Sequence, residues 1–264
     1  MFFKKSLGQN LLIDKNIIKK ILSSTDIRNK NVVEIGPGTG NLTKEIIKLK
    51  PKKLLLIEKD KNFYSKLQKS FASNKSIQTI NSDILKFNLK DLEFDKFTVF
   101  GNLPYNISSQ ILVKFINFYD DTSNYKKIIF MFQKEVGQKI IANFKTKNYS
   151  RLSILTKSRL KILKYFYVSK NCFFPKPKVD SIIIEFEPIK KKEIKVKNIK
   201  SLEFVTRTIF SNKRKMINKS LKKLFKNIDA VAVELKVNLK LRPEQLDELT
   251  YFKIANRYDK ISNI

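Results

Sequence analysis

The chain has 264 residues, 42% of them hydrophobic, and its 55 Lys and Arg outnumber 24 Asp and Glu to give a formal net charge of +31. Its single cysteine excludes an internal disulfide, and because histidine is absent, Cys/His metal clusters and histidine-dependent nucleophilic triads are excluded too. The charge favours a nucleic-acid partner, although only seven of the basic residues are Arg and part of the lysine excess fits the drift of an AT-rich genome.

The opening segment MFFKKSLGQN is too short and too quickly charged for a signal peptide. No apolar run approaches the roughly 20 residues that span a bilayer. We therefore expect a soluble, cytoplasmic protein that does not associate with a membrane, with a monomer as the simplest assembly.

Four short apolar runs recur along the first part of the chain and predict buried strands at 31–36, 53–60, 76–83 and 96–102. Helix-compatible segments at 41–49 and 61–71 separate the first three runs. Strands that are apolar on both faces and alternate with helices indicate a parallel, doubly wound α/β sheet.

The next predicted elements are a helix, a strand and a helix at 108–119, 126–132 and 133–144. Two extended runs at 159–169 and 179–189 are expected to complete a seven-stranded, Rossmann-like sheet with an antiparallel pair. The composition changes at Pro188, because residues 188–226 hold 14 basic and 2 acidic side chains and the remainder has helical spacing. We predict a sheet domain at 1–189 and a small, basic, all-helical domain at 190–264.

A glycine loop and two acids follow the first three predicted strands. Gly36, Gly38 and Gly40 lie where the backbone must turn tightly and approach a ligand, but their G-x-G-x-G spacing departs from the dinucleotide fingerprint and also fits a plain turn. Glu58 can accept both hydrogen bonds of a ribose diol, and Asp83 can meet the amine of an adenine, although either acid alone could be a solvated strand end. Together these residues indicate an S-adenosylmethionine site at the carboxyl edge of the sheet.

The tetrapeptide Asn102-Leu103-Pro104-Tyr105 follows the fourth strand at the same edge. The exocyclic nitrogen of adenine is a poor nucleophile because its lone pair is delocalised into the ring. The Asn102 side-chain oxygen and the Leu103 carbonyl can draw its N–H bonds out of plane, while Pro104 fixes the backbone and Tyr105 stacks on a flipped base. No histidine is needed, since the proton can leave to solvent after methyl transfer; a plain turn is the alternative interpretation.

With these motifs the chain resembles, nearly end to end, the ribosomal RNA adenine N6,N6-dimethyltransferases, in particular those that modify two adjacent adenosines near the 3′ end of small-subunit (16S) ribosomal RNA. The segments that carry the resemblance are 4–14, 34–43, 57–60, 81–83, 101–108, 131–138, 151–155, 173–181 and 212–221. It implies a methyltransferase fold, S-adenosylmethionine as methyl donor, no metal, the small ribosomal subunit as partner, and a late assembly intermediate as substrate.

The resemblance also assigns residues. The family's donor contacts fall on Asn10, Leu12, Gly36, Glu58, Asp83 and Asn102, with Gly38 in the same loop. The target-base pocket falls on Asn102, Leu103, Pro104, Tyr105 and Phe173. In the pattern F-x-P-x-P-K-V-D-S the aligned aromatic is Phe173 and Phe174 has the variable place, although either ring could stack on a base or fill the core.

The chain departs from the family at Leu11, where Phe is usual, and at Asp247, where Ser is common; neither position touches the reacting atoms. A phosphate-binding face is predicted where basic residues recur at helical spacings, namely Lys213, Arg214, Lys215, Lys219, Lys222 and Lys223. Such contacts position RNA without reading its sequence, and a solvated lysine-rich surface is the alternative.

Three other functions fit parts of the sequence. A resistance-type methylase of large-subunit (23S) ribosomal RNA shares the core, but the NLPYNIS, KRK and PEQL segments favour the small-subunit enzyme. A non-catalytic assembly or nucleic-acid-binding relative is disfavoured by the intact tetrapeptide at 102–105 and by both acids. A DNA adenine methylase is disfavoured because no target-recognition domain is recognisable.

Overall fold

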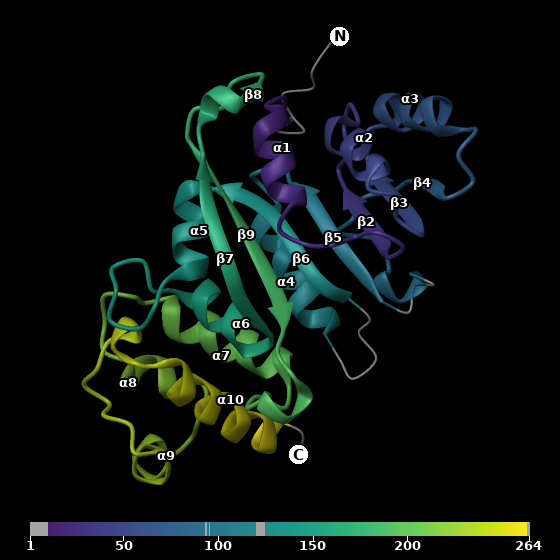
Figure 1. Cartoon of the computed structure of the whole chain (residues 1–264). Helices are drawn as coiled ribbons and strands as arrows, with labels where there is room; N and C mark the ends of the chain where they lie inside the picture. The colour runs from purple at the N-terminus through teal and green to yellow at the C-terminus, as the bar shows by residue number, and fades with distance from the viewer. Residues whose placement is uncertain (1–9, 93, 95, 120–124, 263–264) are drawn as a thin grey trace. The chain divides into compact units, whose positions relative to one another are not determined.

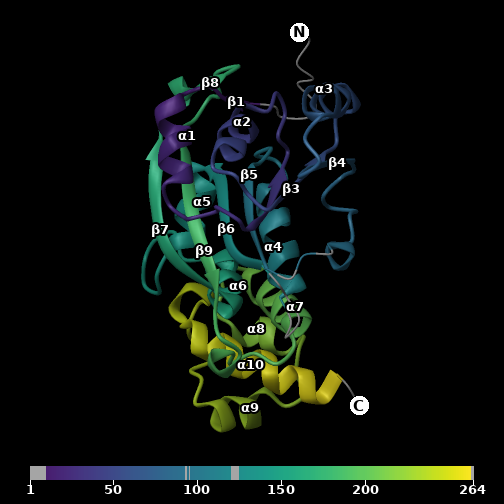
Figure 2. The ribbon, with the colours of Figure 1, turned by 45° about the vertical axis from the view of Figure 1, so that its right-hand side comes forward.

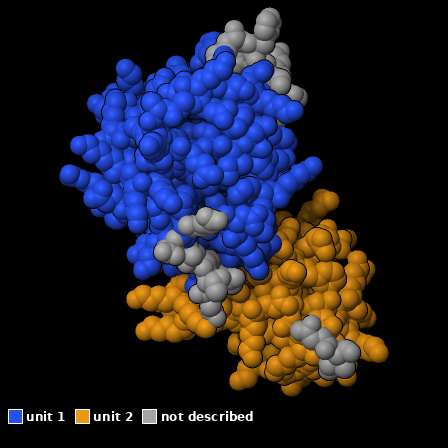
Figure 3. All heavy atoms as spheres, turned by 90° about the vertical axis from the view of Figure 1, so that its right-hand side faces the viewer, with its two compact units in different colours: residues 1–137, 162–188 blue, residues 138–161, 189–264 orange. Residues whose placement is uncertain are grey.

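The computed structural model describes residues 10–92, 94, 96–119 and 125–262. The chain forms two compact units, one of residues 1–137 and 162–188 and the other of residues 138–161 and 189–264 (Figure 3). It passes between them within helix α5 (Lys134–Ile141), within strand β7 (Leu160–Val168) and after Pro188.

The units differ from the predicted domains in one segment. The predicted boundary at residue 189 coincides with the last crossing, but residues 138–161 group with the second unit. The reason is that helix α6 (Arg151–Arg159) packs against α7 (Ile199–Phe210) and α10 (Glu248–Ser262). Ion pairs reinforce this packing, from Arg151 to Glu203 at 3.5 Å and from Lys157 to Glu248.

The first unit is built on a seven-stranded sheet in the order β4-β3-β2-β5-β6-β9-β7 (Figure 1). The strands not yet bounded are β2 (Asn31–Ile35), β3 (Lys53–Glu58), β4 (Ile77–Asn81), β5 (Phe97–Asn102), β6 (Tyr125–Gln133) and β9 (Ser181–Pro188). Neighbouring strands from β4 to β6 are parallel, and β9 is antiparallel to β6. The predicted doubly wound α/β sheet is thereby confirmed.

Helices cover both faces of this sheet (Figure 2). On one face α1 (Lys15–Leu22), α2 (Asn41–Lys48) and α3 (Lys61–Phe71) share a core with Val32, Leu56 and Phe100. On the other face Phe115 of α4 (Ser108–Phe118) meets the ring of Phe130 edge to face at 5.5 Å. Alternate residues of each strand therefore pack against different helices, which explains why the strands read as continuous apolar runs.

A two-stranded ribbon joins β1 (Leu11–Leu12) to β8 (Phe173–Phe174), with Leu11 opposite Phe174 and Leu12 opposite Phe173. Neither strand is predictable from the sequence, because two residues are too few to show a period of two. Nor is α1 among the predicted elements; its first turn is capped by the Asp14 carboxylate accepting from the backbone N–H groups of Asn16 and Ile17.

The second unit is helical and also contains α8 (Asn218–Leu221) and α9 (Ile228–Leu235). The basic segment after residue 200 has helical spacing but does not form one continuous helix, because α7 ends at Phe210 and turns precede α8. Ile217 is fully buried and its N–H donates to the carbonyl of Leu241 at 2.8 Å, so the chain leaves the helical path to bury this side chain.

A substitution at Gly137 on α5 can test how closely this helix packs on β9. A Cβ at this position would lie 1.9 Å from Cγ2 of Ile182. Gly137→Ala is therefore expected to reduce the free energy of unfolding by about 1–3 kcal/mol, although alanine normally favours helices. Urea unfolding measures this loss. The double variant with Ile182→Ala should lose less than the sum of the two single variants, and strict additivity would contradict the contact.

Candidate active site

The carboxyl ends of the central parallel strands border a cavity of about 150 Å³. It brings together most of the predicted site residues, namely Asn10, Gly36, Gly38, Glu58, Asp83, Asn102, Leu103 and Pro104. Of the residues predicted for the donor and target-base sites, four do not line it: Leu12, Gly40, Tyr105 and Phe173. This edge, where the strand order changes direction between β2 and β5, is the usual ligand position in an open α/β sheet.

The glycine loop is fixed by the carboxylate of Glu58. The backbone N–H of Gly38 donates to Glu58 Oε2 at 3.0 Å, and the N–H of Asp60 donates to Oε1 at 2.8 Å. Gly38 has a φ of +56°, and a Cβ there would lie 2.7 Å from Cδ2 of Leu11, so this position favours glycine. Burial raises the pKa of Glu58, against the lowering effect of the two N–H donors.

Asp83 lies at the end of the cavity that follows β4. Its Oδ2 accepts from Lys59 Nζ at 2.8 Å, and its Oδ1 accepts from the N–H of Leu85 at 3.0 Å. The hydrogen bond from Lys59 is the largest cause of the lowered pKa of Asp83. Asp83 therefore stays an acceptor, as recognition of an adenine amine requires.

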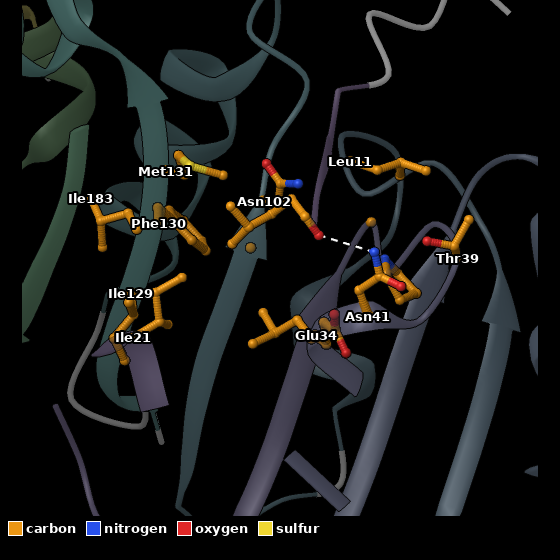
Figure 4. A pocket seen from close by; sticks show the side chains of 15 residues that line it. Leu11, Ile21, Glu34, Thr39, Asn41, Asn102, Ile129, Phe130, Met131 and Ile183 are labelled. Carbon is orange, nitrogen blue, oxygen red and sulfur yellow. Dashed lines mark hydrogen bonds between the residues drawn. The ribbon is translucent and has the colours of Figure 1, made fainter. Parts of the chain in front are cut away.

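The side chain of Asn102 has a defined orientation. Its Nδ2 donates to the main-chain carbonyl of Asn10 at 2.9 Å. A second amide, Asn41 Nδ2, donates to the carbonyl of Leu12 at 3.0 Å (Figure 4). The Asn102 amide attaches the residue before β1 to the end of β5, and the Asn41 amide attaches β1 to the start of α2. Since the Asn102 nitrogen is used in this way, its Oδ1 remains to accept from a ligand.

Leu12 and Asn102 also border a second cavity of about 30 Å³, which contains the buried Glu34 (Figure 4). Glu34 faces the same core as Val32 and lies between Leu56 and Phe100 on the neighbouring strands. Burial raises the pKa of Glu34 to about 8, although the Thr43 hydroxyl donates to its Oε2 at 2.6 Å. The sequence analysis assigns Glu34 no role.

Two aromatic residues of the predicted target pocket have different environments. The Tyr105 hydroxyl lies 2.6 Å from Ser181 Oγ, and burial raises its pKa, so it remains a neutral phenol. Phe173 is only 3% exposed and belongs to the core shared by α1, α2 and α3. Phe174 is 58% exposed and lies opposite Leu11, which borders both cavities. Phe174 thus shares the ribbon face of Leu11, because paired residues point the same way.

Sequence reasoning missed the apolar wall of the larger cavity, formed by Phe63, Ile84, Ile107 and Ile111. Ile84 directly follows Asp83 and Phe63 lies in the first turn of α3, so their proximity to predicted site residues was the available signal. Such a wall suits the faces of a purine ring.

The six predicted RNA-binding residues belong to the second unit and are all exposed. Lys213, Arg214 and Lys215 lie in the turn after α7, whereas Lys219 is on α8 and Lys222 and Lys223 follow it. Lys213 also lies 3.6 Å from Glu244. They therefore do not form the regular helical stripe that their spacing predicts.

Within the described residues, no group of three or more Cys, Asp or Glu side chains is placed to hold a metal ion. None of the helices in this part of the chain has the length and apolar character needed to cross a membrane.

The strand order, the glycine loop and the acid after the second parallel strand define the Rossmann-like class of S-adenosylmethionine-dependent methyltransferases. The sequence profile described as "Ribosomal RNA adenine dimethylase" matches residues 2–260. The chain belongs to this family.

Individual relatives agree with this assignment. The "Ribosomal RNA small subunit methyltransferase A" of Pelagibacter ubique is 45% identical over 98% of this chain and 97% of its own length. The protein of the same name from Malacoplasma penetrans is 38% identical over 96% and 91%. A dimethyladenosine transferase from Plasmodium falciparum superposes with a TM-score of 0.77 at 28% identity, covering 96% and 98% of the two chains. The 23S rRNA methyltransferase ErmE, at 22% identity and a TM-score of 0.66 over 95% and 100%, shares the fold.

Glu34 should make stability depend on pH. Its pKa of about 8 in the folded protein lies above the ordinary 4.5 of a glutamic acid side chain, so the folded state binds the extra proton. The contribution of Glu34 to the free energy of unfolding is therefore most favourable below about pH 4.5 and is lost as the pH rises through 8. When the pH is raised from 5 to 9, the free energy of unfolding of Glu34→Gln should increase relative to that of wild type by on the order of 2–4 kcal/mol.

Urea unfolding at several pH values measures this difference. Glu187→Gln is the matched control, because Glu187 is exposed on β9. Parallel pH curves for wild type and Glu34→Gln would contradict a buried, neutral Glu34.

Proposed function

We propose that this protein transfers methyl groups from S-adenosylmethionine to N6 of two adjacent adenosines near the 3′ end of small-subunit (16S) ribosomal RNA. Its membership of the rRNA adenine dimethylase family and the names of its relatives support the reaction and the subunit. We further propose that it acts as a cytoplasmic monomer on a late assembly intermediate of the subunit.

The residues around the larger cavity fit the donor. The Glu58 carboxylate, held by two backbone N–H groups, has further lone pairs for a ribose diol, and Asp83 is an ionised acceptor for the adenine amine. The same cavity is bordered by Asn10, Gly36 and Gly38, and the neighbouring smaller cavity is bordered by Leu12. When bound, S-adenosylmethionine supplies an electrophilic methyl group on a sulfonium.

The hydrogen bond between Asn102 and Asn10 carries the proposal for catalysis. It leaves Asn102 Oδ1 available to accept one N–H of the target amine, and the Leu103 carbonyl is the second acceptor. Pro104 restricts the backbone between them, and Tyr105, anchored to Ser181, offers its ring to the flipped base. Because the Tyr105 phenol is neutral and no histidine exists, the proton leaves to solvent after methyl transfer.

Methyl incorporation into isolated, undermethylated small and large subunits tests the function. Label in the small-subunit RNA, mapped to two adjacent dimethyladenosines, is the expected result. Label only in the large subunit would indicate a 23S-type methylase. Failure of the protein to bind S-adenosylmethionine would indicate a non-catalytic relative.

Asn102→Ala should reduce methyl transfer about 30- to 1,000-fold, equivalent to about 2–4 kcal/mol of barrier, because a preorganised acceptor is lost. Binding of S-adenosylmethionine, measured by calorimetry, should weaken much less. Asn62→Ala, at an exposed position of α3, is the control and should behave as wild type. Normal turnover by Asn102→Ala would refute the role of this amide.

The two adjacent phenylalanines can be separated by mutation. Phe173→Ala should lower the free energy of unfolding by about 3–5 kcal/mol because the ring is buried in the core. Phe174→Ala should leave stability within about 0.5 kcal/mol of wild type. If Phe173 also stacks on the base, Phe173→Leu should retain most of the stability but lose turnover; if Phe174 stacks, turnover falls in Phe174→Ala instead. Wild-type turnover in both Phe173→Leu and Phe174→Ala would show that neither ring of β8 takes part in binding the target base.

Replacing Lys213, Arg214 and Lys215 with glutamine should weaken binding to the small subunit and make the affinity less dependent on salt. The reason is that each phosphate contact contributes about 0.7–0.9 to the slope of log K against log salt concentration. Filter binding across a salt series measures the slope. Glutamine at Lys66, Lys69 and Lys75 of the first unit, which are also exposed, is the matched control. An unchanged slope would show that Lys213, Arg214 and Lys215 do not contact RNA phosphates.

A further inference from the structure

The outer strand of the sheet carries exposed aromatic side chains that the proposed catalysis does not use. β7 is last in the strand order (Figures 1 and 2). Leu163, Tyr165 and Tyr167 occupy every second position of β7 and therefore share one of its faces. Leu163 is 38% exposed, and each tyrosine is 49% exposed. The two tyrosine rings lie edge to face with centroids 6.2 Å apart, a contact that covers at most one face of the Tyr165 ring and leaves the other face for a base.

The charge around this strand complements a polyanion. Residues 162–179 contain four lysines and no Asp or Glu. Lys134, at the start of α5, lies with Nζ 5.4 Å from the centre of the Tyr167 ring, and its side chain is exposed. Lys164 is half exposed and lies 3.4 Å from Glu185, so it is partly neutralised. Interleaved aromatic rings and lysines on a sheet are typical of surfaces that bind single-stranded RNA.

A short series of contacts connects this surface to the tetrapeptide at 102–105. The N–H of Lys134, next to Tyr167, donates to the carbonyl of Asp180 at 2.9 Å. The next residue, Ser181, has its Oγ 2.6 Å from the Tyr105 hydroxyl. The Tyr167 end of β7 is therefore close to the proposed target pocket, and the strand extends roughly 13 Å from Tyr167 to Leu163.

We propose that the exposed face of β7, formed by Leu163, Tyr165, Tyr167 and Lys134, binds single-stranded RNA next to the target adenosines. The tyrosines stack on bases and the lysine contacts phosphate. This surface holds the strand after it leaves the pocket, so it contributes to substrate binding and not to the transfer step. The inference rests on the proposed function, since it takes ribosomal RNA as the substrate.

The test compares Tyr165→Ala/Tyr167→Ala with Tyr165→Phe/Tyr167→Phe, which keeps both rings. The probes are a fluorescein-labelled 12-nucleotide RNA of mixed sequence and undermethylated small subunits. The alanine variant should bind the oligonucleotide at least about tenfold more weakly, with a raised KM for subunits, while kcat at saturation and affinity for S-adenosylmethionine are unchanged. The phenylalanine variant should resemble wild type.

Three outcomes would overturn the inference: wild-type binding by the alanine variant, equal losses in the alanine and phenylalanine variants, or reduced subunit binding with unchanged oligonucleotide binding, which would indicate a protein partner. If the alanine variant unfolds, wild-type protein with 4-thiouridine-labelled oligonucleotide replaces it, and absence of crosslinks to β7 would overturn the proposal. Failure of the proposed function is distinguishable, because wild-type protein would then not methylate small subunits.

Discussion

The candidate site depends on a carboxylate that is buried before any ligand arrives. Glu58 accepts from the N–H groups of Gly38 and Asp60, and so connects the loop after β2 to the turn after β3. Burial of a carboxylate is unfavourable unless hydrogen bonds compensate, and these two donors provide compensation that survives without the cofactor. The pocket is therefore largely organised in advance, and less ordering free energy is lost on binding.

Preorganisation extends to the proposed catalytic amide. Asn102 is held by the Asn10 carbonyl, and Asn41 holds the carbonyl of Leu12. The same segment pairs with β8, whose Phe173 is in the core and whose Phe174 is exposed. The short β1–β8 ribbon thus connects the segment that contains Asn10 to Asn102 and to the exposed ring of Phe174, although these residues are far apart in the sequence.

The sequence was sufficient to predict the parallel sheet, because its strands are buried on both faces and appear as apolar runs bounded by helices. It also placed Gly36, Glu58, Asp83 and Asn102 at one edge, since the carboxyl ends of parallel strands coincide. It could not predict the β1–β8 ribbon or the orientation of Asn102, because both depend on contacts between residues far apart in the chain. The interrupted basic helix was missed for a similar reason, since the burial of Ile217 outweighs local helix propensity.

The acceptor that orients Asn102 belongs to the main chain. Any amino acid at position 10 supplies the same carbonyl, so a substitution there can alter side-chain contacts without removing this hydrogen bond. An insertion between Asn10 and Leu11, the first residue paired with β8, would instead shift the carbonyl by one residue, reversing the direction in which it points. The spacing of this segment therefore matters more to this hydrogen bond than the identity of residue 10, and a change of length here would misalign Asn102 while every proposed catalytic side chain is retained.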